Sequence, residues 1–340
     1  MTTRLIQWIL CICLLTQANL AQGAEPDAQP IPVESSNPVI SCVSLHGQGT
    51  ILATAGDDHL VRIWDLTSGK QTHQLAGHTG WVRTSAFVGQ SNTLITAGDD
   101  GRIIRWDVVS GKQLDILARV DHAIWRIAVN PKGTQVAASG FSNTITVVDL
   151  MTAATVQEMQ GSTTDIRGLA YSSTGLRLAS GGRDGLIHIW STETGQETAS
   201  FVAHHRRIRD LCYLRQGSRI VSISDDRTLH VGCLDESQKS YSLPLGKLLP
   251  MAIAVCSENQ VAVGASDNQI HLWNIDTRQE TRVYQGHTGS VVALDFKADE
   301  KGRQGTLISG SYDTSIRSWQ FQPAENSALR VSEQTSANRK

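Results

Sequence analysis

The sequence has little net charge, few aromatic residues and no long apolar pattern at helical spacing. Its 340 residues carry 30 Lys+Arg and 32 Asp+Glu, a formal net charge of −2, and only 5% are aromatic. Nucleic-acid binders usually carry a strong basic excess, so we expect no nucleic-acid partner. Because glycine (29 residues) and β-branched residues are frequent instead, we expect an all-β protein with many turns.

Signatures of several common enzyme sites are missing as well. The chain contains no Gly-x-x-x-x-Gly-Lys-Ser/Thr phosphate loop, no His-Glu-x-x-His zinc helix and no Cys-x-x-Cys-His haem site. His204 and His205 are adjacent but isolated, which does not suggest a metal site. We therefore predict no catalytic residues, no metal and no cofactor.

One apolar run stands near the N-terminus, between Leu5 and Leu15, and it follows Arg4. A membrane-spanning helix needs about 20 residues, so this run is too short to favour a permanent anchor, which is the alternative. Ala21 and Gly23 supply the small residues that a signal peptidase reads. We predict a signal peptide over 1–23, a leader segment over 24–30, and a periplasmic or extracellular protein that is not inserted in a membrane after cleavage. Residues 323–340 are polar, and we expect a disordered tail there.

A repeat of 42 residues runs through the rest of the chain. Trp64, Trp106 and Trp190 each end an apolar segment at this spacing, with one unit skipped. The same register, with small changes of loop length, gives seven anchor positions, which are Trp64, Trp106, Val148, Trp190, Gly232, Trp273 and Trp319. An aspartate stands six residues before every anchor but one, and a Ser or Thr stands ten residues before five of them. A self-similar unit of this length is typical of repeat folds whose units bury their apolar faces on each other.

These units resemble the WD-repeat (WD40) family. Gly77-His78 opens a unit that Trp106-Asp107 closes, and Trp64-Asp65 closes the unit before it. The resemblance implies a seven-bladed β-propeller over residues 31–322, built from four-stranded antiparallel blades. By register, residues 31–33 occupy the place of an outermost strand, so we expect the N-terminal strand to close the last blade and remove its free edge.

The resemblance also implies structural tetrads, in which a histidine, a Ser or Thr, an aspartate and a tryptophan are hydrogen-bonded within one blade. Two units carry the complete set, namely His78, Thr96, Asp100 and Trp106, and His287, Ser309, Asp313 and Trp319. A catalytic triad occurs once, whereas these residues recur at fixed offsets. We therefore interpret them as structural.

Positions that the repeat leaves free are the candidates for binding. In WD-repeat propellers the slot 23 residues before the anchor opens on the narrow face, near the central channel. Two neighbouring slots are expected to face the same way, the one two residues earlier and the one just before the repeated aspartate. Together they supply the candidate partner-binding residues Trp81, Arg83, Trp125, Phe141, Arg167, Arg183, Arg207, Arg209 and Tyr312.

Aromatic and arginine side chains carry much of the binding energy at protein interfaces. We therefore predict a non-catalytic scaffold whose narrow face binds a protein or peptide with acidic and apolar groups. An equally weighted interpretation is that nearby aspartates, among them Asp57, Asp99, Asp165, Asp210 and Asp225, pair with the arginines internally. The alternative function is a propeller-type hydrolase or lactonase with its site at the central channel. The sequence indicates neither the oligomeric state nor the identity of the partner.

Overall fold

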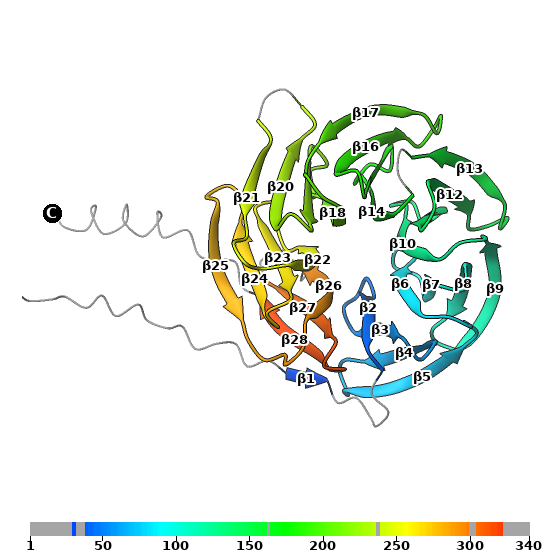
Figure 1. Ribbon diagram of the computed structural model, residues 1–340. Helices are drawn as coiled ribbons and strands as arrows, with labels where there is room; N and C mark the ends of the chain where they lie inside the picture. Colours follow the sequence, from blue (N-terminus) through cyan, green and yellow to red (C-terminus); the bar gives the residue numbers. More distant parts are fainter. Residues whose placement is uncertain (1–28, 32–37, 162–163, 236–238, 299–303, 322–340) are drawn as a thin grey trace, which may run out of the picture.

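A computed structural model describes residues 29–31, 38–161, 164–235, 239–298 and 304–321. In these ranges the chain forms 28 β-strands and no α-helix, and the strands make seven four-stranded antiparallel sheets arranged in a ring (Figure 1). The expected all-β, seven-bladed propeller is therefore confirmed. No helix in the described ranges has the length and apolarity that crossing a membrane requires.

Each blade is a meander whose first strand is innermost, next to the axis of the ring. The first three blades contain β2 (Ile40–Leu45), β3 (Ile51–Gly56), β4 (Leu60–Asp65) and β5 (Lys70–Ala76); β6 (Val82–Phe87), β7 (Thr93–Gly98), β8 (Arg102–Asp107) and β9 (Lys112–Arg119); and β10 (Ile124–Val129), β11 (Gln135–Gly140), β12 (Thr144–Asp149) and β13 (Thr155–Gln160).

The next three blades repeat the same order. They contain β14 (Ile166–Tyr171), β15 (Arg177–Gly182), β16 (Leu186–Ser191) and β17 (Glu197–Val202); β18 (Ile208–Tyr213), β19 (Arg219–Ser224), β20 (Thr228–Cys233) and β21 (Tyr241–Pro244); and β22 (Pro250–Val255), β23 (Gln260–Ala265), β24 (Ile270–Asn274) and β25 (Gln279–Tyr284).

The seventh blade is made from both ends of the described chain. Its first three strands are β26 (Val291–Ala298), β27 (Gly305–Ser311) and β28 (Ile316–Phe321), and its outermost strand is β1 (Gln29–Ile31), which pairs antiparallel with β28 (Figure 1). Closure by the N-terminal strand is therefore confirmed. The strand begins at Gln29, two residues before the expected boundary, so the last residues of the predicted leader belong to the propeller. The predicted signal peptide, the rest of the leader and the predicted tail lie outside the described residues.

The core lies between blades and holds the ring together. One apolar cluster joins the first two blades through Ile63 of β4, Val82 of β6 and Leu94 of β7. Another joins the first and last blades, and in it Trp64 packs with Ile308 and Ile316. All six residues are at most 2% exposed. Because each sheet has two apolar faces, a blade is stable only between two neighbours.

Every innermost strand carries a β-bulge at the same place. In each blade the pairing of the first strand with the second shifts register by one residue near its start, as between Val82 and Thr84 or between Ile124 and Arg126. The bulged residues are Ser41, Arg83, Trp125, Arg167, Arg209, Met251 and Val292, which are the seven residues of the slot 23 before the anchor or its equivalents. Since a bulge changes the direction of a side chain, the backbone itself turns this slot out of the sheet.

Closure by β1 can be tested by comparing a chain that begins at residue 29 with one that begins at residue 32. The second chain lacks the three residues that pair with β28 and exposes that edge. Because a ladder hydrogen bond contributes about 1 kcal/mol, we expect it to be less stable by about 2 kcal/mol in urea unfolding and more prone to aggregate. Superimposable unfolding curves for the two chains would show that β1 does not hold the ring closed.

Candidate functional site

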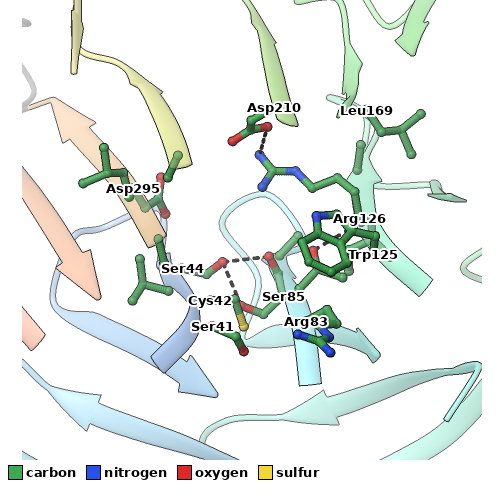
Figure 2. A pocket seen from close by; sticks show the side chains of 18 of the residues that line it. Ser41, Cys42, Ser44, Arg83, Ser85, Trp125, Arg126, Leu169, Asp210 and Asp295 are labelled. Carbon is green, nitrogen blue, oxygen red and sulfur yellow. Dashed lines mark hydrogen bonds and ion pairs between the residues drawn. The ribbon is translucent and has the colours of Figure 1, made fainter. Parts of the chain in front are cut away.

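The seven bulged residues surround one end of a central channel. Together with the strands below them they line a cavity of about 580 Å³, to which every innermost strand contributes. Trp81 and Tyr312 line it as well, beside the bulged residues. Six of the candidate binding residues therefore meet at this cavity, namely Trp81, Arg83, Trp125, Arg167, Arg209 and Tyr312. Figure 2 shows Arg83 and Trp125 there, next to side chains deeper in the channel.

A stack of alternating aromatic and arginine side chains forms part of this mouth. The guanidinium carbon of Arg83 lies 4.2 Å from the ring centre of Trp81 and 5.1 Å from that of Trp125. The guanidinium carbon of Arg167 also lies over Trp125, 4.1 Å from its ring centre, and it lies 5.6 Å from the ring centre of Phe141. Phe141 meets Trp125 edge to face, with ring centres 5.8 Å apart. We call these five residues the aromatic–arginine stack. Its contacts have the geometry of cation–π interactions, which favour the observed order of residues.

Aspartates of the same mouth hold the arginines. Arg83 donates two hydrogen bonds to Asp99, of 2.8 and 2.6 Å, and Arg167 donates one of 2.8 Å to Asp165. The Nε atom of Arg207 lies 3.0 Å from Asp165 as well, although without hydrogen-bond geometry.

Arg209 and Arg183 differ in their surroundings. Arg209 pairs with Asp225 and donates a further bond to the sulfur of Met251. Arg183 is exposed and has no ion pair among the described residues. Of the five candidate arginines, four are thus internally paired, as the second interpretation of the sequence expected, and only Arg183 is not.

A backbone contact explains why three separate slots meet. The amide of Asp99, just before the repeated aspartate, donates to the carbonyl of Trp81, and equivalent bonds occur at Phe141, Asp225, Ser266 and Tyr312. The approach is close at Gly98, where a β-carbon would lie 1.9 Å from the Trp81 carbonyl oxygen. Glycine is therefore required there, and it brings Asp99 within reach of Arg83.

The two complete sets of tetrad residues are hydrogen-bonded. In the second blade His78 bonds Asp100 at 3.0 Å and Thr96 at 2.8 Å, and the indole of Trp106 donates to Thr96 at 2.8 Å. In the last blade His287, Ser309, Asp313 and Trp319 make the same three contacts at 2.7 to 3.0 Å. Burial opposes the charge of Asp313, but hydrogen bonds from Ser315 and Thr288 hold the pKa of its carboxyl well below the usual range.

Blades without the tetrad histidine satisfy the repeated aspartate differently. A basic residue two positions before the anchor pairs with it along the same strand edge, as in Arg62 with Asp58 at 2.6 Å and His271 with Asp267 at 3.1 Å. The sequence contained a signal for these pairs, because the basic residue follows the aspartate by four positions in each case. The tetrad pattern does not include this basic residue, so the sequence analysis missed the pairs.

The blade of β18 to β21 has Gly232 at its anchor position, and a ring from β17 of the preceding blade takes the place of the missing indole. The ring of Phe201 fills the space, and a β-carbon on Gly232 would lie 2.9 Å from it. His204 still bonds Ser222 at 2.8 Å and Asp226 at 3.2 Å. The ring centres of His230 and His204 are 5.8 Å apart. Burial, together with the nearby His204, lowers the pKa of His230 to about 4.

Deeper in the channel lie charged residues that the sequence did not single out as a site. Arg126, in the slot just after the bulge, forms an ion pair of 3.1 Å with Asp210, and Asp295 stands across the channel from Arg126 (Figure 2). The signal was available, because the other residues of this slot in the repeat are small or apolar, namely Cys42, Thr84, Gly168, Ala252 and Ala293. Among the described residues no group of three or more His, Cys, Asp or Glu could hold a metal ion.

The sequence of this protein matches the model of a known family. The profile described as "WD domain, G-beta repeat" matches residues 31–65, 69–107, 154–191, 195–231 and 278–320, which is more than half of the chain. The chain belongs to the WD40 family. The profile leaves out much of the blade built from β10 to β13 and of the blade built from β22 to β25. These two blades of the WD40 protein are recognised by their packing and repeat register instead.

Individual relatives match shorter stretches. The U3 snoRNP-associated protein-like EMB2271 of Arabidopsis thaliana is 40% identical over 20% of this chain and 14% of its own length. The THO complex subunit 6 homolog of Danio rerio is 36% identical over 18% of each chain. The protein transport protein SEC13 of Coccidioides immitis is 43% identical over 15% of this chain and 18% of its own. The aligned part thus spans less than a fifth of each of these relatives.

The tetrad of the second blade makes a graded prediction for stability. Trp106→Ala removes a buried indole and leaves Thr96 without its donor, so we expect a loss of about 3–5 kcal/mol of unfolding free energy. Trp106→Phe keeps most of the volume and loses the hydrogen bond, with an expected cost of about 1–2 kcal/mol. Tyr312→Ala, at a residue 51% exposed, is the control and should cost less than about 1 kcal/mol. Equal effects of the two Trp106 variants in urea unfolding would contradict the role of the hydrogen bond.

His230 makes a prediction for pH. Its folded pKa of about 4 lies below the ordinary value of 6.5, so the unfolded chain binds a proton at a pH where the folded chain does not. The stability it contributes is complete above pH 6.5 and is lost as the pH falls towards 4, by an amount on the order of 2 kcal/mol. His230→Gln should therefore lose less stability than the wild type between pH 7 and pH 4.5. Parallel stability curves for the two proteins would contradict the assignment.

Proposed function

We propose that this WD40 protein is a non-catalytic binding platform and that its partner docks on the narrow face, over the aromatic–arginine stack. The observation that carries the proposal is the exposure of aromatic rings on a rigid mouth. Trp81 is 37% exposed, Phe141 46% and Tyr312 51%. Large aromatic groups held in place lose little conformational entropy on binding and are enriched at interface centres.

The internal ion pairs modify the expected chemistry of the partner. Because Asp99, Asp165 and Asp225 neutralise the arginines beside them, the mouth is not a simple basic patch. A guanidinium has five N–H donors, and two bonds to Asp99 leave Arg83 with donors for another acceptor. We therefore propose a protein or peptide whose apolar groups contact the rings and whose acidic groups bind the remaining donors and the exposed Arg183.

The proposed compartment is periplasmic or extracellular. Its support is the pattern of Arg4, the apolar run from Leu5 to Leu15 and the small residues at Ala21 and Gly23. The relatives named above are, by their names, a U3 snoRNP-associated protein-like protein, a THO complex subunit homolog and a protein transport protein, and this supports a protein partner without indicating which one. The channel-centred hydrolase or lactonase stays an alternative prediction, and no observation favours it.

Affinity capture with matched variants tests the platform. The chain from residue 24 is immobilised as wild type, as the double variant Trp81→Ala/Trp125→Ala, and as a control that removes exposed apolar groups elsewhere, Met151→Ala/Leu176→Ala, whose residues are 90% and 63% exposed. We expect the wild type and the control to retain the partner equally. The tryptophan variant should retain it at least tenfold less, which corresponds to a loss of about 1.4 kcal/mol or more of binding free energy.

The acidic character of the partner is tested at Arg183, whose reversal breaks no internal ion pair. Arg183→Glu should weaken retention of the partner and make that retention less sensitive to salt. Lys112→Glu, on the outer strand β9, should change neither the retention nor its sensitivity to salt. Equal retention by the wild type and all four variants would refute the narrow face as the docking surface.

A further inference from the structure

The channel contains an ion pair that spans two blades. Arg126 on β10 reaches past β14 to Asp210 on β18, and its Nη2 atom lies 3.1 Å from Oδ1 of Asp210. The equivalent residue on β14 is Gly168, where a β-carbon would lie 2.8 Å from the side chain of Leu211. No side chain fits at Gly168. Figure 2 shows the side chain of Arg126 directed towards Asp210.

Arg126 is not saturated by this contact. Its side chain is 35% exposed to the channel, while that of Asp210 is only 7% exposed. In the described part of the chain it makes no other ion pair, and none of its N–H groups donates a hydrogen bond of good geometry. A guanidinium with five donors and a single partial partner is an unusual arrangement inside a protein, because unpaired polar groups in confined sites are costly.

Asp295 supplies an opposite charge that is also unbalanced. Its two carboxylate oxygens accept hydrogen bonds from the backbone amides of Leu45, at 2.7 Å, and Phe296, at 2.8 Å. No Lys, Arg or His among the described residues forms an ion pair with it. Arg126, Asp210 and Asp295 carry a formal net charge of −1, and the charge of Lys297, which lines the same cavity, also acts on Asp295 without forming an ion pair. Free donors of Arg126 therefore lie on one side of the channel, and a carboxylate without an ion pair lies on the other.

The channel beside these charges is lined by polar side chains and, between them, by the methyl groups of several alanines. The residues that surround it at this depth include Ala86, Ala128, Ala170, Ala252 and Ala293. The cavity of about 580 Å³ lies within the range of small-molecule sites, which combine apolar walls with a few polar groups.

We propose that the channel between Arg126 and Asp295 binds a small zwitterion, an α-amino acid with an aliphatic side chain. Its ammonium group lies against Asp295, its carboxylate accepts from the free donors of Arg126, and its side chain contacts the alanine walls. An anion alone would face two carboxylates, and a cation alone would leave the donors of Arg126 unpaired. This site is below the mouth and does not depend on the partner proposed for the narrow face.

Calorimetric titration of the full chain with L-leucine and two analogues tests the proposal. Isoamylamine has the side chain and the ammonium group without the carboxylate, and isocaproate has the side chain and the carboxylate without the ammonium group. We expect leucine to bind with a one-to-one stoichiometry and each analogue to bind at least tenfold more weakly. An analogue that binds as tightly as leucine, or the absence of any binding at 10 mM leucine, roughly the limit of weak specific binding, would overturn the proposal.

Two variants and matched controls assign the charges. Arg126→Gln and Asp295→Asn should each weaken leucine binding at least tenfold. Arg105→Gln and Asp115→Asn, which break an ion pair of the second blade between β8 and β9, should not. Thermal unfolding verifies that each variant is folded, and the analogue series on the wild type gives a result even if one is not. Unchanged leucine binding in both channel variants would overturn the assignment.

The pH dependence gives a second measurement on the wild type. Burial raises the pKa of Asp295 to about 6, while the charges of Arg126 on β10 and Lys297 on β26 act in the opposite direction, and Cys212 on β18 also interacts with Asp295. Arg126 interacts in turn with Asp210 on β18 and Cys42 on β2. Burial also raises the pKa of Asp210, and it raises those of Cys42 and Cys212 to about 11 and about 12, so the thiols stay neutral. Leucine should therefore bind more weakly at pH 5 than at pH 7.5, and equal or tighter binding at pH 5 would contradict the role of Asp295.

Discussion

The packing of each sheet against two neighbours is the constraint on which the rest of the structure depends. A four-stranded blade with two apolar faces has no stable state alone, so seven blades must close into a ring. Closure requires β1 to complete the blade of β26 to β28, which joins residues almost 290 positions apart in the sequence, Gln29 and Ser318. Long-range pairing of this kind has a large loop-closure entropy and forms late in folding on general grounds.

The same ring positions the candidate sites. Seven bulges at equivalent places turn one residue per blade towards the channel mouth, so the fold fixes where side chains meet and the sequence decides which ones do. Ser41, Met251 and Val292 are ordinary lining residues and Arg209 pairs with Asp225, whereas Arg83, Trp125 and Arg167 stand in adjacent blades and stack on one another. Internal aspartates hold the arginines in this order. The mouth is consequently a pre-organised surface, and pre-organisation lowers the entropic cost of binding a partner.

The repeat made the architecture readable from the sequence, but the sequence left open whether aspartates or a partner pair with the arginines of the mouth. Regular spacing located the anchors, the tetrads and the slot of Arg83, because each is set by backbone geometry that recurs in every blade. Whether Arg167 bonds Asp165 or a partner depends on side-chain rotamers across blades, which spacing does not encode. The ion pair of Arg126 with Asp210 joins residues two repeats apart, and the start of β1 at Gln29 lies outside the repeat.

Closure of the ring is the central claim, and hydrogen exchange of the backbone amides tests it most directly. Amides of β28 that face β1 should be protected to the same extent as the amides of β4 and β8 that face their own outermost strands, β5 and β9. Exchange of the β28 amides at the rate of a free sheet edge, with β4 and β8 protected, would contradict the account, because the last blade would then lack its outermost strand.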